Sequence, residues 1–475
     1  MTTPREPGPH TARTGERTNT VLTTALGQAS WSPREFVRAL NLRLDAVGEP
    51  RLDLTAAHAW VRGSVPRSDA VRRLAAAVLT AKAGTEYTPS SLWGSHCTSA
   101  LPTKTVTDDL IGRRLLTDVL DTAAAWNTSD PRDQATLRPA SDLFTAAWDA
   151  TRQPRPATGR ESGIDHVLPP LMNLLERHLA ELRRLDDATG GGALSQRYVR
   201  TALDGVLGLL RHSRYTPAVG TRLLRNASGL AQLAGWMAFD ADLAAAGQRY
   251  QLLAIRLAQA GDDHDTVANV LGMLAYQHAA SQNPAAALRF AEAAVTSAAR
   301  SLPTVRARAL GRLATAHAAA GDLDAFRDAT DRCHALLEHR RSDDPPALYY
   351  FTPDQVAAES GQALVDLAAN NQGRARRLLA EANSLLSPLA DHGSTSGYRR
   401  SALLHGIHLA RANLLAHEPE ATIHCLLRLT SHLPDVQSIR CRNLLGSLRR
   451  HAGTRIKSAS GADALSQVDR ALSAA

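Results

Sequence analysis

The chain has 475 residues, 44% of them hydrophobic and 4% aromatic, and its 54 basic residues exceed 46 acidic ones for a net charge of +8. This hydrophobic content excludes an intrinsically disordered chain, and no run approaches the ~18 apolar residues of a membrane-spanning helix. Because Ala and Leu dominate over β-branched and aromatic residues, we expect an all-α fold.

The cysteines and the N-terminus indicate the compartment. Four cysteines are scattered without a CxxC pair, which argues against a disulfide framework or a zinc site. The N-terminal residues include no apolar core of a secretion signal. We therefore expect a cytoplasmic protein without membrane contact, associated with the nucleoid if it binds DNA.

The positive charge is carried almost entirely by arginine, since Lys82, Lys104 and Lys457 are the only lysines. Arginine makes bidentate contacts to phosphate and guanine, so the basic excess fits a nucleic-acid partner. A genome with GC-rich codons explains the same composition equally well.

The chain begins with a polar, Pro/Gly-rich segment, residues 1–20, which we expect to be disordered. Residues 21–94 read as a compact domain of short helices. A capping box, Ser32-Pro33-Arg34-Glu35, opens one of them. Its buried face repeats every four residues, at Phe36, Leu40 and Leu44.

Two further helices follow in this domain. A short one, about Thr55–Arg62, stops at Gly63. The next begins after Pro66, with Ser68 as its expected N-cap. Its apolar stripe consists of Val71, Leu74, Ala75 and Val78.

The segment from Thr55 to Pro66 is a helix ending in Trp-x-x-Gly, followed by a proline and an amphipathic helix. It resembles the recognition helix of the phage-repressor-like (XRE-type) helix-turn-helix family. The resemblance implies that Ala57 and Trp60 face the core, as their i, i+3 spacing also indicates. It places four residues near the DNA groove: Thr55, Ala56, His58 and Ala59.

Two departures from the family weaken base readout. Leu54, Ala56 and Ala59 stand where the family usually has polar residues, and the segment 47–53 before the helix is longer than usual. We therefore expect phosphate contacts to carry much of the affinity. The arginines assigned to them are Arg62, Arg67, Arg72 and Arg73. The alternatives are a helical domain used only for protein contacts and, for His58, an ordinary surface histidine.

Residues 95–162 form a linker and helical connector, with breaks at about 95–108 and 153–159. From 163 to 475 helix follows helix, and whether 109–220 belongs to the same stack stays open. Internal similarity starts near residue 227. It aligns Leu230, Leu233, Ala234, Ala246 and Tyr250 with Leu271, Leu274, Ala275, Ala287 and Ala291, and then with Leu310, Leu313, Ala314, Phe326 and Thr330.

This spacing resembles the tetratricopeptide repeat, with a period of about 40 residues instead of the usual ~34. It implies an α-solenoid in which small residues let paired helices approach closely. In such repeats some first-helix positions face a concave groove; here they are Ser228, Asn269, Tyr276, Arg308 and Thr315. Polar groups beside glycines suit an extended peptide or another bound chain. A solvated inner face without a ligand is the alternative.

From about residue 30 to 450 the chain looks like a family of actinobacterial regulators that join this helix-turn-helix type to tetratricopeptide repeats. The segments Leu233–Asp240 and Trp60–Gly63, with Tyr250 and Pro66-Arg67, carry the likeness. The architecture is also similar to Gram-positive quorum-sensing regulators. The resemblance implies a homodimer on double-stranded DNA that responds to a peptide, small-molecule or protein signal and controls development or secondary metabolism, including antibiotic production.

Motifs of an enzyme are missing from the sequence, which has neither a Walker loop nor HExxH, and Gly393–Gly397 is not a nucleophile elbow. The glycines of Thr189–Gly192 lack the flanking strand of a dinucleotide site. Cys333, His334 and His339 have a spacing that could suit metal ligands, but no carboxylates or second cysteine accompany them, which argues against a metal site. We expect no catalysis, cofactor or metal. The rival function is an interaction scaffold whose helix-turn-helix does not bind DNA.

Overall fold

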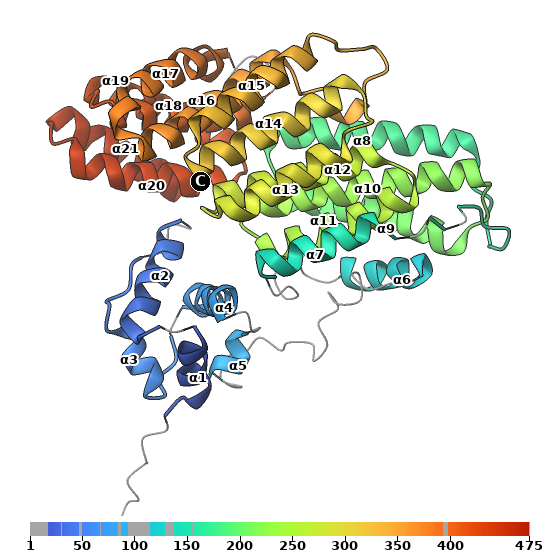
Figure 1. The fold of residues 1–475 in the computed structure, drawn as a ribbon, viewed down its shortest axis with the longest axis horizontal. Helices are drawn as coiled ribbons and strands as arrows, with labels where there is room; N and C mark the ends of the chain where they lie inside the picture. Colours follow the sequence, from blue (N-terminus) through green and yellow to red (C-terminus); the bar gives the residue numbers. More distant parts are fainter. Residues whose placement is uncertain are drawn as a thin grey trace, which may run out of the picture. The chain divides into compact units, whose positions relative to one another are not determined.

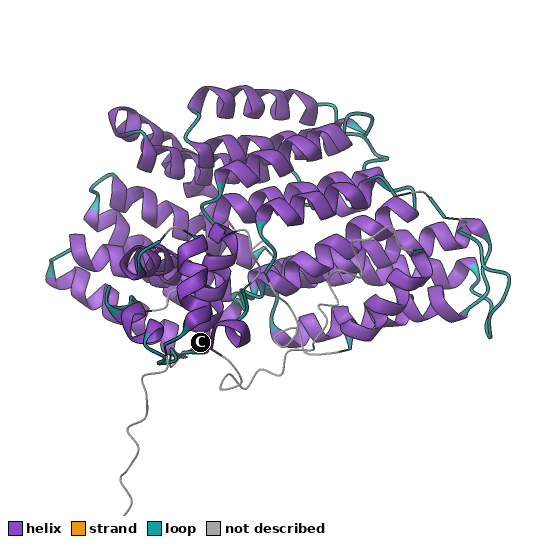
Figure 2. Cartoon of the chain, turned by 60° about the horizontal axis from the view of Figure 1, so that its bottom comes forward, coloured by secondary structure: helices purple, strands orange, loops and turns teal. Residues whose placement is uncertain are grey.

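The computed structural model describes residues 18–29, 31–46, 50–66, 68–83, 87–93, 115–128, 137–153, 155–156, 158–392 and 398–474. Within these ranges it contains 21 α-helices, a few short 3-10 turns and no β-strand, so the all-α prediction is confirmed (Figure 2). The chain divides into two compact units: unit 1 is residues 1–45 with 49–100, and unit 2 is residues 46–48 with 101–475. No described helix has both the length and the apolar character that crossing a membrane requires.

Unit 1 is built from five short helices (Figure 1). They are α1 (Thr20–Gln28), α2 (Pro33–Ala46), α3 (Ala56–Val61), α4 (Asp69–Ala83) and α5 (Pro89–Trp93). Of residues 1–20, predicted to be disordered, positions 1–17 lie outside the described residues. Asn19 caps α1, since its side chain accepts from the Leu22 N–H at 2.9 Å.

The predicted helix signals of unit 1 are confirmed. The Ser32 N–H donates to the Glu35 carboxylate at 2.8 Å, and the Glu35 N–H donates to Ser32 Oγ at 3.3 Å, which is the reciprocal capping box. Gly63 adopts a left-handed φ of 94°, which lets the Ser64 N–H reach the Ala59 carbonyl at 3.0 Å and ends α3.

The core of unit 1 is organised around Trp60. Its ring packs edge-on against Phe36 at 6.3 Å and against Trp93 at 6.2 Å between centroids. Ala57, one turn earlier, is fully buried. Both predicted core positions of α3 are therefore in the core, and they fix which face of this helix points outward.

Unit 2 is a succession of helices, most of them joined by short turns (Figure 1). The helices are α6 (Leu116–Asn127), α7 (Ala140–Thr151), α8 (Pro169–Thr189), α9 (Ala193–His212), α10 (Pro217–Asp240), α11 (Ala244–Ala260), α12 (His264–Ala280), α13 (Pro284–Ser297), α14 (Pro303–Ala320), α15 (Leu323–Leu337), α16 (Pro353–Asn370), α17 (Ala375–His392), α18 (Arg399–Leu415), α19 (Pro419–His432), α20 (Ile439–Arg455) and α21 (Ala459–Ala474). The segment predicted as connector contributes α6 and α7, which pack on α9 and α11.

One turn recurs between consecutive helices and sets the repeat length. Asp242, Asp262 and Gln282, spaced 20 residues apart, adopt left-handed φ values of 61°, 53° and 57°. At each turn the next N–H donates back to the carbonyl five residues earlier, as Asp263 does to Ala258 at 2.9 Å. This is the Schellman arrangement that closes a helix end. Two such helices make one period, which explains the internal spacing of about 40 residues.

The last helices return to the first, because α18 packs on α8 and α20 packs on α10. At this junction the Gln437 N–H donates to the Thr189 carbonyl at 2.8 Å. The glycines after Thr189 make the approach feasible, since a Cβ on Gly192 would lie 1.8 Å from Gln437 Oε1. In place of the expected concave groove, the structure has a cavity whose wall includes α18 and α20.

Candidate functional site

The outward face of α3 carries part of the predicted DNA-binding set. Thr55, His58 and Arg62 are exposed and Ala59 is half-buried. Ala56 instead packs against the core of unit 1. The Thr55 N–H and hydroxyl both donate to Asp53 Oδ1, at 2.8 and 2.5 Å, so the start of the helix has a fixed conformation.

The predicted phosphate-binding arginines differ in their surroundings. Arg62 and Arg73 are exposed. Arg72 is half-buried, and its Nη1 donates to the Pro66 carbonyl at 3.0 Å, so it braces the loop before α4. Arg67 lies outside the described residues.

Two exposed arginines of α2, Arg34 and Arg38, are not in the predicted DNA-binding set, because the Ser32–Glu35 pattern by itself indicates only a helix cap. Hydrogen bonds from Thr55 lower the pKa of Asp53, and Arg34 lowers it further, which places Arg34 near the start of α3. The available signal was the i, i+4 spacing of the two arginines, which puts them on one helix face.

The five predicted groove residues are not brought together. Ser228 is fully buried and its hydroxyl donates to the Ala254 carbonyl at 2.8 Å, so it joins α10 to α11 and faces no groove. Arg308 is also buried, in an ion pair with Glu359. Asn269 is half-buried and Thr315 donates to the Gly311 carbonyl of its own helix. Tyr276 alone of the five lines the large cavity of unit 2.

These misassignments have one physical cause. The predicted groove positions assume a stack of helix pairs in which the first helix of each pair has a free inner face. In the structure α10 is 24 residues long and contacts α8, α9, α11, α12 and α20, so its residues are buried on most sides. Ser228 therefore lies in a seam between helices.

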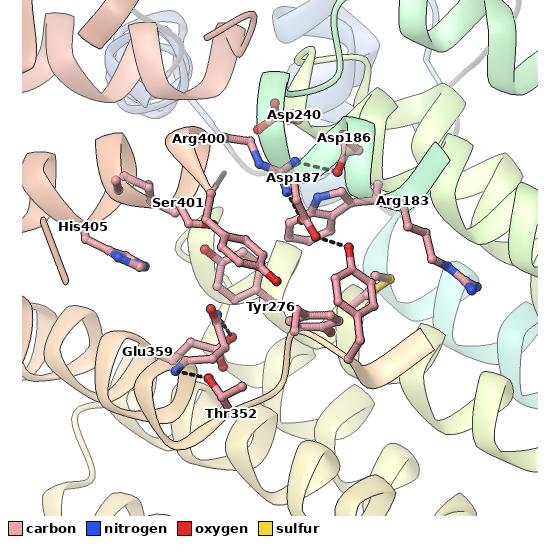
Figure 3. Close-up of a pocket in the computed structure, with 18 of the residues that line it drawn as sticks. Arg183, Asp186, Asp187, Asp240, Tyr276, Thr352, Glu359, Arg400, Ser401 and His405 are labelled. Atoms are coloured by element: carbon pink, nitrogen blue, oxygen red, sulfur yellow. Dashed lines mark hydrogen bonds and ion pairs between the residues drawn. The ribbon is translucent and has the colours of Figure 1, made fainter. Parts of the chain in front are cut away.

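The cavity has a volume of about 380 Å³ and is lined by side chains of α8, α10, α12, α14, α16, α17, α18 and α20 and of the loop before α16 (Figure 3). This size falls in the range of small-molecule sites. Five aromatic side chains contribute to its wall: Trp236, Tyr276, Tyr349, Tyr350 and Tyr398.

One end of the cavity is acidic, and its ion pairs connect α8, early in unit 2, to α18, late in the same unit. Arg400 of α18 binds Asp186 at 2.8 Å and Asp187 at 3.2 Å, both on α8. Tyr349 donates to Asp187, and Ser438 donates to Asp240 at 2.9 Å. Asp186 is 2% exposed, and its Oδ1 has no hydrogen-bond partner among the described residues.

Asp186 is the carboxyl with the most strongly raised pKa in this cluster. Burial raises it to about 7, with Asp240 and Asp187 adding to the shift and Arg400 opposing it. The acidic end therefore reduces its surplus negative charge by holding a proton near neutral pH.

At the other end of the cavity, where Figure 3 labels Glu359 and Thr352, Arg308 and Arg312 pair with Glu359, and this is the basic end. Glu359 of α16 accepts from Arg308 at 2.9 and 3.1 Å, from Gln355 at 2.8 Å, and pairs with Arg312 at 3.5 Å. Burial alone would raise the pKa of Glu359, but Arg308 and Arg312 lower it to about 2. The carboxylate is thus ionised at every physiological pH.

Reactive side chains near the cavity are held in unreactive states. Burial raises the pKa of the Cys441 thiol to about 11 and lowers that of His405 to about 4. Both groups are therefore neutral near pH 7, so the Cys441 thiol is a poor nucleophile and His405 adds no positive charge to the cavity wall. Elsewhere Cys333 is buried while His334 and His339 on the same segment are exposed, so these three do not converge.

We expect Asp186→Asn to flatten the pH dependence of stability. Asp186 has a raised pKa in the folded state, so its stabilising contribution is present below the unfolded value near pH 4 and is lost as pH rises through 7. Between about pH 5 and pH 8, urea unfolding of the wild-type protein should therefore show an extra loss of about 2–3 kcal/mol relative to the variant. The control is Asp204→Asn, on an exposed position of α9. Equal pH profiles for wild type and Asp186→Asn would contradict the assignment.

A comparison with models of known protein families gave no match for this chain, and neither did a comparison with curated protein sequences.

Proposed function

We propose that the protein is a DNA-binding transcriptional regulator whose unit 1 contacts DNA through α3 and whose unit 2 senses a signal that binds in its central cavity. The observation that carries the DNA-binding half is the outward face of α3. Trp60 and Ala57 anchor the helix to the core, and Thr55, His58 and Arg62 remain exposed. Arg34, Arg38 and Arg73 add exposed positive charge to the same unit.

The signal-sensing half is supported by the cavity. It is large enough for a small molecule, mostly apolar in its wall, and bounded by helices from both ends of the series. A ligand in contact with α8, α16 and α18 would stabilise the arrangement in which they meet, which is what a sensor needs. A homodimer reading two half-sites belongs to the same proposal.

DNA selection tests the proposal directly. The purified protein is incubated with a fragmented genomic library of its host at two salt concentrations, and a shared recovered motif is the expected result. No binding at low salt would favour the interaction scaffold instead.

On the recovered site we expect Arg62→Ala and Arg73→Ala each to weaken binding and to reduce the slope of log affinity against log salt by about 1, because each removes one phosphate contact. Arg306→Ala is the charge-matched control, since Arg306 is an exposed residue of unit 2. Fluorescence anisotropy over a salt series measures both quantities. Unchanged affinity and slope in both unit 1 variants would show that Arg62 and Arg73 do not contact the DNA.

A further inference from the structure

Two arginines from distant parts of unit 2 converge on one ring at the basic end of the cavity. The guanidinium carbon of Arg312 (α14) lies 4.4 Å from the centroid of Tyr276 (α12), and that of Arg440 (α20) lies 5.0 Å from it. All three residues line the cavity. Arg440 also donates to the Tyr276 hydroxyl.

These two cations have few direct ion pairs. Glu359 is the single carboxylate within ion-pair distance of Arg308 and Arg312 among the described residues, and Arg308 already binds both of its oxygens. Arg440 has no carboxylate within that distance in the described part of the chain, and the charge of Asp240 acts on it only over a longer range. Arg308 and Arg312 therefore share one carboxylate and Arg440 is left without a direct ion pair, in a region where Arg312 is only 5% exposed.

The two ends of the cavity differ in how they can lose surplus charge. At the acidic end Asp186 can take up a proton. Arginine keeps its charge at any physiological pH, so the basic end can only be neutralised by an anion. A buried cation without a direct ion pair is unfavourable, and an incoming anion relieves that cost.

Neutral donors accompany the arginines. Gln362 lies on the same face of α16 as Glu359, is 8% exposed and lines the cavity. Next to this polar group the wall is apolar and aromatic, with Leu233, Trp236, Met273, Leu389 and Leu404. The cavity thus offers an anion site joined to an apolar compartment.

We propose that the cavity binds a small amphipathic molecule through a carboxylate, held by Arg312, Arg440 and Gln362, with its apolar or aromatic body against Trp236 and Met273. This inference rests on the proposed role of unit 2 as a sensor and names the chemical class of its ligand. Guanidinium–carboxylate pairs are strong and geometrically specific in a desolvated site.

The test uses two fluorescent probes that share a ring and a linker and differ in charge: 6-(dansylamino)hexanoate, an anion, and dansylcadaverine, a cation. Dansyl emission rises and shifts to the blue in an apolar site, so a titration of the full chain gives a Kd for each. We expect the anion to bind at least about ten-fold more tightly.

Arg312→Gln and, separately, Arg440→Gln should weaken binding of the anionic probe by about ten-fold or more and leave dansylcadaverine unchanged or improved. Arg306→Gln is the matched control, because Arg306 is an exposed residue of the same helix as Arg312 and should change neither Kd. Thermal unfolding of each variant shows whether it is folded, and two separate variants keep the test valid if one is not.

Equal Kd values for the two probes, tighter binding of the cation, or no binding of either up to about 1 mM would overturn the inference. So would a preference for the anion that both arginine variants retain. None of these results depends on DNA, so a protein that selects a DNA motif but ignores the anionic probe would refute the ligand class alone. A protein that binds the probe without binding DNA would refute the proposed role as a DNA-binding regulator and leave the ligand class intact.

Discussion

Replacing Arg400 with Gln is expected to cost the protein about 3–5 kcal/mol of unfolding free energy at neutral pH, one of the two largest effects of a single substitution that we predict. Arg400 is the cation that binds both Asp186 and Asp187, across a separation of more than 200 residues in the chain. Without it, the buried Asp186 and the half-buried Asp187 lose the cation that pairs with both of them. Unfolding of the full chain by urea measures the loss.

The neighbouring residue provides a matched control. Arg399 pairs with Asp435 at 3.3 Å, but both side chains are about half exposed, so Arg399→Gln should change stability by less than about 1 kcal/mol. The loss in Arg400→Gln should also shrink as pH falls toward about 5, because protonated carboxyl groups need no cation. Equal effects of the two substitutions, or a loss independent of pH, would mean that the Arg400 pair does not join α18 to α8.

Local patterns in the sequence were sufficient to predict much of this fold. The capping box at Ser32 and the left-handed cap at Gly63 depend on residues within a few positions of each other, and both are present. The burial of Ala57 and Trp60 follows from their i, i+3 spacing. The aligned small residues, such as Ala234, Ala275 and Ala314, are buried where helices pack closely.

The site could not be predicted in the same way, because it is made by contacts that no local pattern encodes. Arg400 and Asp186 are 214 residues apart, and nothing in either segment indicates that they meet. Counting positions on an open stack consequently assigned Ser228 and Arg308 to a groove, whereas both are buried between helices. Tyr276 does line the cavity, and its assignment to an inward-facing position required only the periodicity of its own helix.

Replacing Glu359 with Gln should have an effect of similar size at the other end of the cavity. Gln keeps the shape of the side chain but removes the charge that Arg308 and Arg312 share, and Arg308 is only 2% exposed. We expect a loss of about 3–5 kcal/mol in urea unfolding. Glu292→Gln, at an exposed position of α13, should be close to neutral.

The pH dependence identifies the cause of that loss. The pKa of Glu359 is about 2 in the folded protein, below its ordinary value of 4.5, so its stabilising contribution is fully present above pH 4.5 and disappears as pH falls through 2. The difference in unfolding free energy between wild type and Glu359→Gln should therefore be constant near neutral pH. It should become smaller in acid, by about 3 kcal/mol between the unfolded and folded pKa values of Glu359. A difference that persists unchanged in acid would mean that packing, and not charge, accounts for the loss.

A second substitution tests whether surplus positive charge is the origin of the instability. In the Glu359→Gln background, Arg312→Gln leaves Arg308 as the one fully buried cation near position 359, so the double variant should be more stable than the sum of the two single losses predicts. The anionic probe 6-(dansylamino)hexanoate should raise the unfolding temperature of Glu359→Gln more than that of the wild type, because the variant has one more unneutralised guanidinium at the same site. Strictly additive losses together with equal thermal shifts would show that the arginines around Tyr276 do not act as one anion-binding group.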